Sequence, residues 1–376
     1  EANPAKVPHP GEQFSTTTLI AKELPKPRVT RILHRGEYHS PTGDPLQPDT
    51  PQVMGPFPDD LPRNRLGLAK WLISPDHPLT ARVLVNRIWQ RVFGYGLVRT
   101  PEDFGLQGEQ ATHPELLDWL AVEFREDRWN LKKMLRRMVT SRTFRQSSSR
   151  RPVLNDPENR LFARGPGFRL DAEVIRDLGL WASELLDPTM GGEGVKPYQP
   201  VGLWKALMHP ASNTKNYFRD KGTRLYRRSL YVYWKRTSPH PMMTLFDAPN
   251  RESSCVKRSR TSTALQSLAL LNETQRIEVS RKLAERLLKA ADADHERLDT
   301  LYQLLACRAT RDAEREACLG LLAIMKKRYQ DVPDDAHALL ATGDAPTDST
   351  LAPPELAAWT QLVTTVLASD IALSLY

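Results

Sequence analysis

The sequence of 376 residues has little cysteine and no long apolar run, and both absences exclude classes of protein. Its three cysteines, Cys255, Cys307 and Cys318, are too few and too odd in number for a disulfide framework. Cys-x-x-Cys-His is absent, so no c-type haem can be attached within this segment, and we expect no cofactor in it. No apolar run approaches the roughly 18 residues that cross a bilayer, so we expect no membrane span.

The signature motifs of several common enzymes are also missing. There is no Gly-x-x-x-x-Gly-Lys-Ser/Thr phosphate loop, no Gly-x-Ser-x-Gly elbow and no His-Glu-x-x-His pair. The nine histidines are scattered and have no cysteines beside them, so we expect no metal site. Nucleotide hydrolysis, standard esterase chemistry and zinc proteolysis therefore lose their best sequence support.

The composition is moderately basic and rich in proline. Lys and Arg number 53 against 45 Asp and Glu, which gives a net charge of +8. Such a charge permits attraction to nucleic acid, anionic lipid or acidic polysaccharide, but it identifies none of them. Thirty prolines against nineteen glycines predict many stiff, irregular connections.

Residues 1–62 are expected to form a Pro-rich extended strap. Repeated prolines prevent a helix there, because each removes a hydrogen-bond donor and restrains the residue before it. The apolar residues that would anchor the strap to the folded body are Ile32, Leu33, Val53, Met54 and Phe57. A disordered linker is the alternative. The sequence starts at Glu1 with no initiator Met and no leader, so we expect a fragment of a longer product.

Beyond the strap, apolar residues recur every three or four positions, which is typical of amphipathic helices. The pattern predicts helices over 64–73, 79–93, 111–124, 130–141, 169–186, 263–272, 274–290, 296–309, 311–330 and 354–367. Thr112 and Glu115 have the spacing of a capping box. Residues 229–236 are the best strand candidate, and 331–354 are expected to be a loop. We therefore expect a mainly α fold: a helical domain over 63–376 with long Pro-rich ordered loops, little β-structure and a sub-boundary near 146–160.

The stretch "SLYVYWKRTSPHPMMTLFDAPNRESSCVKRSRT" combines aromatic rings with many cations. Planar guanidinium groups can pair with carboxylates and stack on rings, so we expect a structural Arg–Asp–aromatic network that holds long loops on the helical body. The residues concerned are Arg228, Tyr231, Trp234, Arg236, Asp247, Arg258 and Arg260. A pocket for an anionic or sugar ligand, and a nucleic-acid surface, are the alternatives.

A second network is expected in the helix predicted over 79–93. Arg82 and Asn86 lie four residues apart and share one side of it. Pairing of Arg82 or Arg87 with Asp103 would anchor the Gly-rich turn that follows the helix.

The long stretch "NRLGLAKWLISPDHPLTARVLVNRIWQRVFGYGLVRTPEDFGLQGEQATHPELLDWLAVEF" resembles the planctomycete domain of unknown function 1553, the PSD domain. "RRSLYVYWKRT", "LFDAPNRE", "RSRTSTALQSLALLN" and "LAAWTQLVTTVLASD" resemble the same family in the same order, over roughly residues 30–376. The chain departs from the family pattern at Ser262 and Ala264, where Asn and Pro are common, and it lacks the usual Asn-x-x-Glu-Phe ending.

The resemblance implies the C-terminal part of a large exported protein, periplasmic or at the cell surface. Family members resemble one another in carrying an upstream cytochrome c module, a second domain of unknown function and sometimes lectin-like modules. The expected partners are therefore upstream domains of the same polypeptide, one of which would hold haem. No catalytic residues are carried over from the family.

From these observations we expect a non-catalytic module of a redox- or polysaccharide-associated protein, with anionic polysaccharide as a plausible ligand. The enzymatic alternative is a redox or hydrolytic reaction on carbohydrate, with Asp103, His113 and Asp247 as acid–base candidates. A weaker alternative is nucleic-acid binding through the basic region 125–151, which has no accompanying recognition motif.

Overall fold

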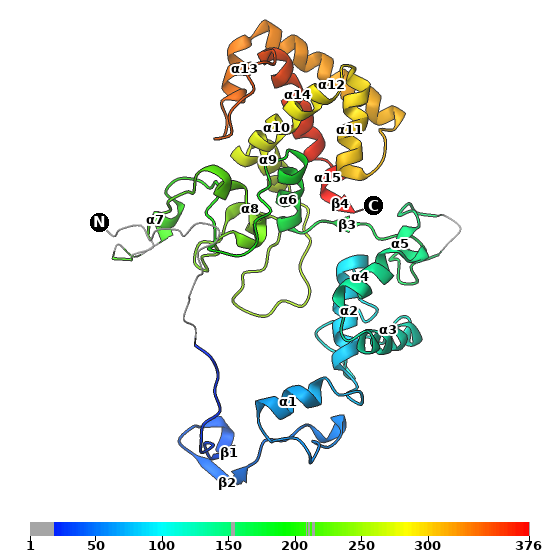
Figure 1. The fold of residues 1–376 in the computed structure, drawn as a ribbon, viewed down its shortest axis with the longest axis vertical. Coiled ribbons are helices and arrows are strands. Elements are labelled where there is room, and N and C mark those ends of the chain that lie inside the picture. The colour runs from blue at the N-terminus through cyan, green and yellow to red at the C-terminus, as the bar shows by residue number, and fades with distance from the viewer. Residues whose placement is uncertain (1–18, 152–154, 208, 210, 213–214, 376) are drawn as a thin grey trace.

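The computed structural model describes residues 19–375 except 152–154, 208, 210 and 213–214, and it is mainly helical, which confirms the predicted fold class (Figure 1). The α-helices are α1 (Arg65–Leu72), α2 (Thr80–Phe93), α3 (Pro114–Glu126), α4 (Leu131–Val139), α5 (Arg142–Arg145), α6 (Ala172–Ala182), α7 (Leu203–Leu207), α8 (Pro241–Leu245), α9 (Ala264–Asn272), α10 (Thr274–Ala290), α11 (Asp294–Ala306), α12 (Asp312–Asp331), α13 (Pro333–Leu340), α14 (Pro353–Leu367) and α15 (Asp370–Leu373). The strands are β1 (Thr30–Leu33), β2 (Pro41–Leu46), β3 (Phe168–Arg169) and β4 (Ser374–Leu375).

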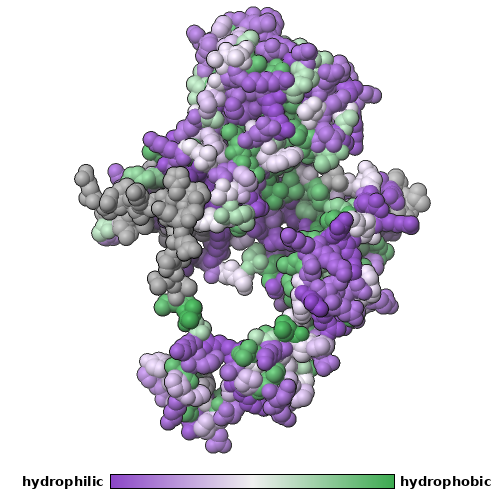
Figure 2. Space-filling view, in the orientation of Figure 1, coloured by the Kyte–Doolittle hydropathy of each residue, from purple (hydrophilic) through white to green (hydrophobic). Residues whose placement is uncertain are grey.

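The largest core is built around α14, which packs against α10, α12 and α13. Trp359 of α14 is fully buried, as are Leu283 of α10 and Leu298 of α11. On the face drawn in Figure 2, hydrophilic residues cover most of the α12–α13 end, and hydrophobic residues gather across the middle of the molecule. The helix α14 is therefore a central element of the fold, although its sequence alone predicts only an ordinary apolar helix.

A separate core is formed by α2, α3 and α4. Val85, Phe124 and Met134 are buried in it, and Asn130 caps α4 by accepting from the backbone N–H of Lys133. Between α5 and β3 no helix or strand lies in the described residues. The sub-boundary near 146–160 stays a prediction.

The N-terminal segment forms the antiparallel hairpin β1–β2, and Figure 1 shows it at the end of the molecule opposite α12–α14. Anchoring by Ile32, Leu33 and Val53 was a wrong prediction, because their exposed fractions are 59%, 40% and 89%. Phe57 is buried as predicted, and it contacts α1 at Gly67, where no space remains for a side chain.

Three local predictions are wrong. The strand expected over 229–236 is a 3-10 turn (Ser229–Tyr231) followed by a single bridge from Val232 to Val195. The partner segment holds Gly194 and a proline two residues on from Val195, so it cannot extend into a strand.

The loop expected over 331–354 contains α13, which starts with Pro333 in its first turn, where the missing donor is harmless. The capping box of α3 is also absent, because Thr112 donates to the carbonyl oxygen of Leu97 at 3.3 Å instead. Within the described residues no helix has the length and apolar character needed to cross a bilayer.

Candidate functional site

Arginines and carboxylates form a network where β3, the start of α6 and the segment 247–261 meet. Arg169 of β3 forms an ion pair with Asp247. Arg258 donates to both carboxylate oxygens of Glu173 of α6, at 2.6 and 3.2 Å. Burial raises the pKa of Glu173, but the hydrogen bonds from Arg258, a backbone hydrogen bond and the positive charges of Arg258 and Arg251 together hold the pKa below its ordinary value. Of the residues expected in a network, Arg258 therefore pairs with Glu173 and Asp247 pairs with Arg169.

Asp247 closes the base of the long segment 248–260. Its backbone is left-handed, with φ of 62°, a region in which aspartate is enriched. The carboxylate accepts from the backbone N–H of Thr261 at 2.8 Å and from its hydroxyl at 3.0 Å. Arg169 donates to the same carboxylate, so Asp247 holds the two ends of the segment together and against β3.

Arg260 and Asp171 connect this network to the end of α2. The Arg260 guanidinium lies 4.3 Å from the centroid of the Phe168 ring and donates to the carbonyl oxygen of Gly94 at 3.4 Å. Burial lowers the pKa of Arg260. Asp171 accepts from Arg91 of α2 at 2.7 Å. Polar contacts therefore hold the end of α2 against the start of α6 and the segment 247–261.

The other members of the predicted network are more exposed. Tyr231 stacks under the guanidinium of Arg227, at 3.9 Å, and the Trp234 indole donates to the carbonyl oxygen of Asn250 at 3.1 Å. Arg228 and Arg236 have side chains that are 44% and 71% exposed. Arg228 lies 3.9 Å from Asp177 and Arg236 lies 3.5 Å from Glu252, so both arginines have a carboxylate neighbour at the surface and neither is paired with Asp247.

The network predicted for α2 also has different partners. Arg82 pairs with Asp118 of α3 at 2.5 Å, and Arg87 is exposed. Asn86 is fully buried, and its amide binds both backbone groups of Val98, at 2.9 and 3.0 Å. The turn after α2 is thus anchored by an amide rather than by an Arg–Asp pair.

The three acid–base candidates do not converge. Asp103 accepts from the backbone N–H of Gly105 at 2.7 Å in a tight turn. His113 precedes α3, with its Nδ1 3.0 Å from the Thr112 hydroxyl. Asp247 lies at the base of its own loop. Among the described residues there is also no group of three or more His, Cys, Asp or Glu arranged to hold a metal ion.

Two polar cavities lie close to the ring of Tyr95. Tyr95 was not among the residues predicted from the sequence. The first, of about 590 Å³, is lined mainly by residues 247–259, and the second, of about 300 Å³, by the end of α2 and residues 157–168. The Arg99 guanidinium is 4.6 Å from the Tyr95 ring centroid, and the Lys257 ammonium is 6.0 Å from it. Because Lys257 lines the first cavity and Tyr95 the second, the two cavities are neighbours.

Cations outnumber carboxylates in the lining of these two cavities. The cations are Arg99, Arg160, Arg164, Lys257 and Arg258, and the carboxylates are Glu102, Glu158 and Asp247. Arg164 donates to the backbone carbonyl oxygens of Asp156 and Pro157, at 3.0 and 2.8 Å. Lys257 has no ion pair with a described residue. The arrangement can therefore attract an anionic group from solvent.

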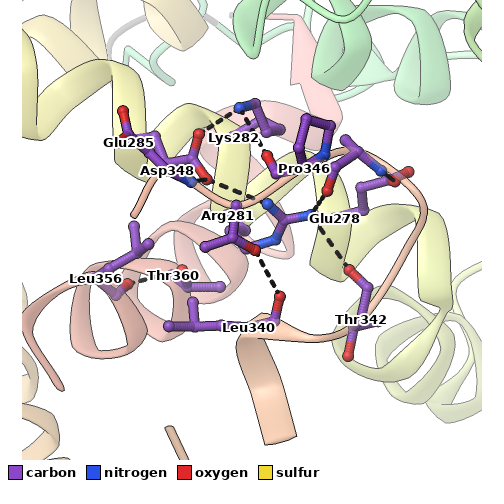
Figure 3. A network of polar contacts seen from close by, with 12 residues as sticks. Glu278, Arg281, Lys282, Glu285, Leu340, Thr342, Pro346, Asp348, Leu356 and Thr360 are labelled. Atoms are coloured by element: carbon purple, nitrogen blue, oxygen red, sulfur yellow. Dashed lines mark hydrogen bonds and ion pairs between the residues drawn. The ribbon is translucent and has the colours of Figure 1, made fainter. Parts of the chain in front are cut away.

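A further charged network, also missed from the sequence, lies along α10 (Figure 3). Arg281 is 1% exposed; it donates to Glu285 at 3.1 Å and to the carbonyl oxygen of Ala345 at 2.6 Å. Glu278 accepts from the backbone N–H groups of Asp344 and Ala345, at 2.6 and 2.7 Å. These groups hold the segment between α13 and α14 against α10. Arg281 and Glu278 therefore stabilise the fold, because their charged groups bind backbone and side-chain groups of the same chain.

The same carboxylate of Glu278 accepts from two tyrosines. The hydroxyls of Tyr226 and Tyr198 lie at 2.9 and 3.1 Å. Burial and the neighbouring Glu278 raise the pKa of Tyr198 to about 12, and they raise the pKa of Tyr226 as well. Both tyrosines therefore remain protonated donors at neutral pH.

The model of the PSD1 family, described as a protein of unknown function (DUF1553), matches residues 64–322. The chain belongs to the PSD1 family. The match confirms the resemblance seen in the sequence, and it starts at the cap of α1 and ends in α12. All residues that line the two Tyr95 cavities lie within the PSD1 match. No curated protein and no solved structure matches the chain.

Proposed function

We propose that this PSD1 chain is a non-catalytic binding module for anionic polysaccharide, and that it works within a larger exported protein that carries a haem domain upstream. Three of the five cations around Tyr95 are paired: Arg99 with Glu158, Arg160 with Glu109 and Arg258 with Glu173. The observation that supports this function is the remaining two cations, Lys257 and Arg164, which have no ion pair with a described residue. Neither side chain is paired with a carboxylate in the described part of the chain, where the Arg164 guanidinium donates to the backbone carbonyl oxygens of Asp156 and Pro157.

Sulfate or carboxylate groups on a sugar chain fit this arrangement. The first cavity is open and is lined by the hydroxyls of Ser253, Ser254 and Ser259 and by the amide of Asn250, which can bind sugar hydroxyls. Tyr95 is 47% exposed between the two cavities. Because the cations lie at the surface, binding should depend strongly on ionic strength.

The enzymatic alternative has less support. A general acid or base must reach a reacting group, and it usually shares a concave site with the other catalytic residues. Neither cavity beside Tyr95 is lined by two of the candidates Asp103, His113 and Asp247. Asp247 is moreover occupied by Arg169 and Thr261.

Nucleic-acid binding through residues 125–151 is also less favoured. Arg137 lies 2.7 Å from Glu123 and 3.4 Å from Asp127, and Lys133 forms an ion pair with the same aspartate. Part of the positive charge of this region is therefore neutralised within the helices.

The test is calorimetric titration with dextran sulfate and with unsulfated dextran of equal length. We expect binding of the sulfated polymer only, at an ionic strength of about 0.02 M, and weaker binding at about 0.15 M. Lys257→Glu should weaken the binding about 5- to 10-fold, because it removes one attraction and adds one repulsion.

Lys70→Glu in α1 is the matched control, since Lys70 is exposed and lies outside both cavities. It makes the same change in net charge and should leave affinity within about twofold. Failure of the unaltered protein to bind at low ionic strength would refute the proposal. Equal losses from both substitutions would show that net charge, and not the Tyr95 cavities, attracts the polymer.

A further inference from the structure

A third cavity, of about 680 Å³, shares no lining residue with the two polar cavities. It lies between α8, α9, the start of α10 and residues 198–201. We propose that this cavity binds an uncharged, mainly hydrocarbon small molecule, which donates one hydrogen bond to Nδ1 of His240. The proposal is independent of the polysaccharide function.

The walls of the cavity are apolar although they are open to solvent. Leu265 and Leu268 of α9 are 64% and 59% exposed, and Val201 is fully exposed. The capping box of Thr263 and Gln266 fixes how α9 begins, and Gln266 and Leu270 face inward at 5% and 2% exposure. The outward face of α9 is therefore leucine-rich, where a surface helix ordinarily carries polar residues.

His240 supplies a polar atom without a partner at this cavity. The side chain is 6% exposed, and its Nε2 lies 2.8 Å from the carbonyl oxygen of Tyr198. A carbonyl oxygen can only accept, so Nε2 carries the proton and Nδ1 is left as an acceptor. Nδ1 is buried and has no hydrogen-bond partner among the described residues. A buried acceptor without a donor is rare and costly, and a ligand that supplies the donor would remove the cost.

Met242 lies where the cavity meets a smaller one. His240, Met242 and Glu273 line both this cavity and a smaller one of about 30 Å³ behind it. The unbranched Met242 side chain has three rotatable bonds, so it can adapt its shape to a ligand bound beside His240.

The charges around the smaller cavity favour a neutral ligand. Arg176 donates to the side chains of Gln275 and Ser229 and to two backbone carbonyl oxygens. Arg276 donates to the carbonyl oxygens of Ile175 and Leu367. Glu273 accepts from the backbone N–H of Arg276, and burial raises the pKa of its carboxyl group. Glu273 would repel a carboxylate ligand, and Arg176 and Arg276 would repel a cationic ligand. An alcohol or a secondary amine attached to an aromatic ring avoids both conflicts.

The test uses two fluorescent compounds, N-phenyl-1-naphthylamine and its N-methyl derivative. Both are uncharged and nearly equal in size, and only the first has an N–H donor. We expect saturable binding of the first compound and about 5- to 10-fold weaker binding of the second, which corresponds to one net hydrogen bond. Equal affinities for the two compounds would overturn the role of His240.

Leu268→Glu places a charge on the cavity wall and should weaken binding of the first compound at least about tenfold. Ile324→Glu on α12 is the matched control, because Ile324 is 63% exposed and lies outside the cavity. Equal losses in both variants would overturn the site. Sedimentation of the unaltered chain and of Leu268→Glu adds a further check: a dimer that Leu268→Glu dissociates would mean that a second copy, and not a small molecule, covers the leucines.

Discussion

At the scale of single residues, the environment of a side chain decides whether it is available for chemistry. Asp247 has a left-handed backbone and a carboxylate filled by Arg169 and Thr261. His240 differs, because its Nε2 donates to the carbonyl oxygen of Tyr198 while its Nδ1 has no hydrogen-bond partner among the described residues. Burial lowers the pKa of His240 to about 4 and so keeps the ring neutral.

The lowered pKa of His240 predicts a loss of stability in acid. An unfolded histidine binds a proton below about pH 6.5, whereas folded His240 does so only near its pKa of about 4. The unfolded state therefore binds more protons in this window, and stability falls as the pH drops through it. Between about pH 7.5 and pH 5, the free energy of unfolding should fall by about 2 kcal/mol more in the unaltered protein than in His240→Gln.

Urea titrations at the two pH values measure this difference. The comparison with His240→Gln is needed because Glu273, whose pKa is raised, has the opposite pH dependence and is present in both proteins. Gln retains an N–H that can donate to Tyr198. Parallel pH profiles for the two proteins would contradict a buried neutral histidine.

The residues that contact the predicted site residues could be identified from the sequence only in part. Arg258 was correctly expected to pair with a carboxylate, because a cation in an aromatic, partly buried segment needs a partner. Its partner Glu173 is 85 residues away, and no local spacing connects the two. Tyr95 was missed because its role depends on Lys257, which only the folded loop brings near.

At the scale of elements, the period of apolar residues was a good guide to helices and a poor guide to the segments between them. The helix α10 was predicted over 274–290 and is found there. The helix α13 was missed because the segment 331–354 contains four prolines and five aspartates, a composition typical of loops, whereas burial of Ala336 and Leu340 stabilises the helix. Tertiary contacts had the deciding influence on such short elements.

The segment after α13 provides a test at this scale. Gly343 has φ of +90°, and a Cβ there would lie 2.5 Å from Oε1 of Glu278. Because Glu278 is held by four hydrogen bonds, it cannot move aside. Gly343→Ala should lower the free energy of unfolding by about 3 kcal/mol.

Gly320 in α12 is the matched control for that substitution. It lies inside a helix, and a Cβ added there would meet no atom within 4 Å. Gly320→Ala should therefore stabilise the protein, by up to about 1 kcal/mol. Urea unfolding of both variants gives the comparison, and a loss from Gly320→Ala as large as that from Gly343→Ala would refute this account.

At the scale of the whole molecule, polar contacts join the core of α2–α4 to the other two hydrophobic cores, one around α10 and α14 and one formed by α6, α8 and α9. The core of α2–α4 and the core around α10 and α14 share no residue. Arg91 with Asp171, and Arg260 with Gly94, connect the two parts. Partly exposed ion pairs add little stability, so the cores should unfold separately.

We therefore expect two transitions in urea. Leu120→Ala and Leu283→Ala each remove a side chain that is at least nine-tenths buried, at a cost of about 2–5 kcal/mol. Leu120→Ala should lower the midpoint of one transition only, and Leu283→Ala that of the other. Circular dichroism measures both midpoints. A single transition that both variants shift equally would mean that the polar contacts couple the cores into one cooperative unit.

The shared carboxylate of Glu278 has a consequence for how this sequence can diverge. Its four hydrogen-bond donors come from three separated parts of the chain. Gly343 lies so close to this carboxylate that no larger residue fits there. A substitution at one of these positions is harmful until the others change with it. Across relatives, Glu278, Gly343, Tyr198 and Tyr226 should accordingly be inherited as a set and lost as a set, while neighbouring surface positions drift independently.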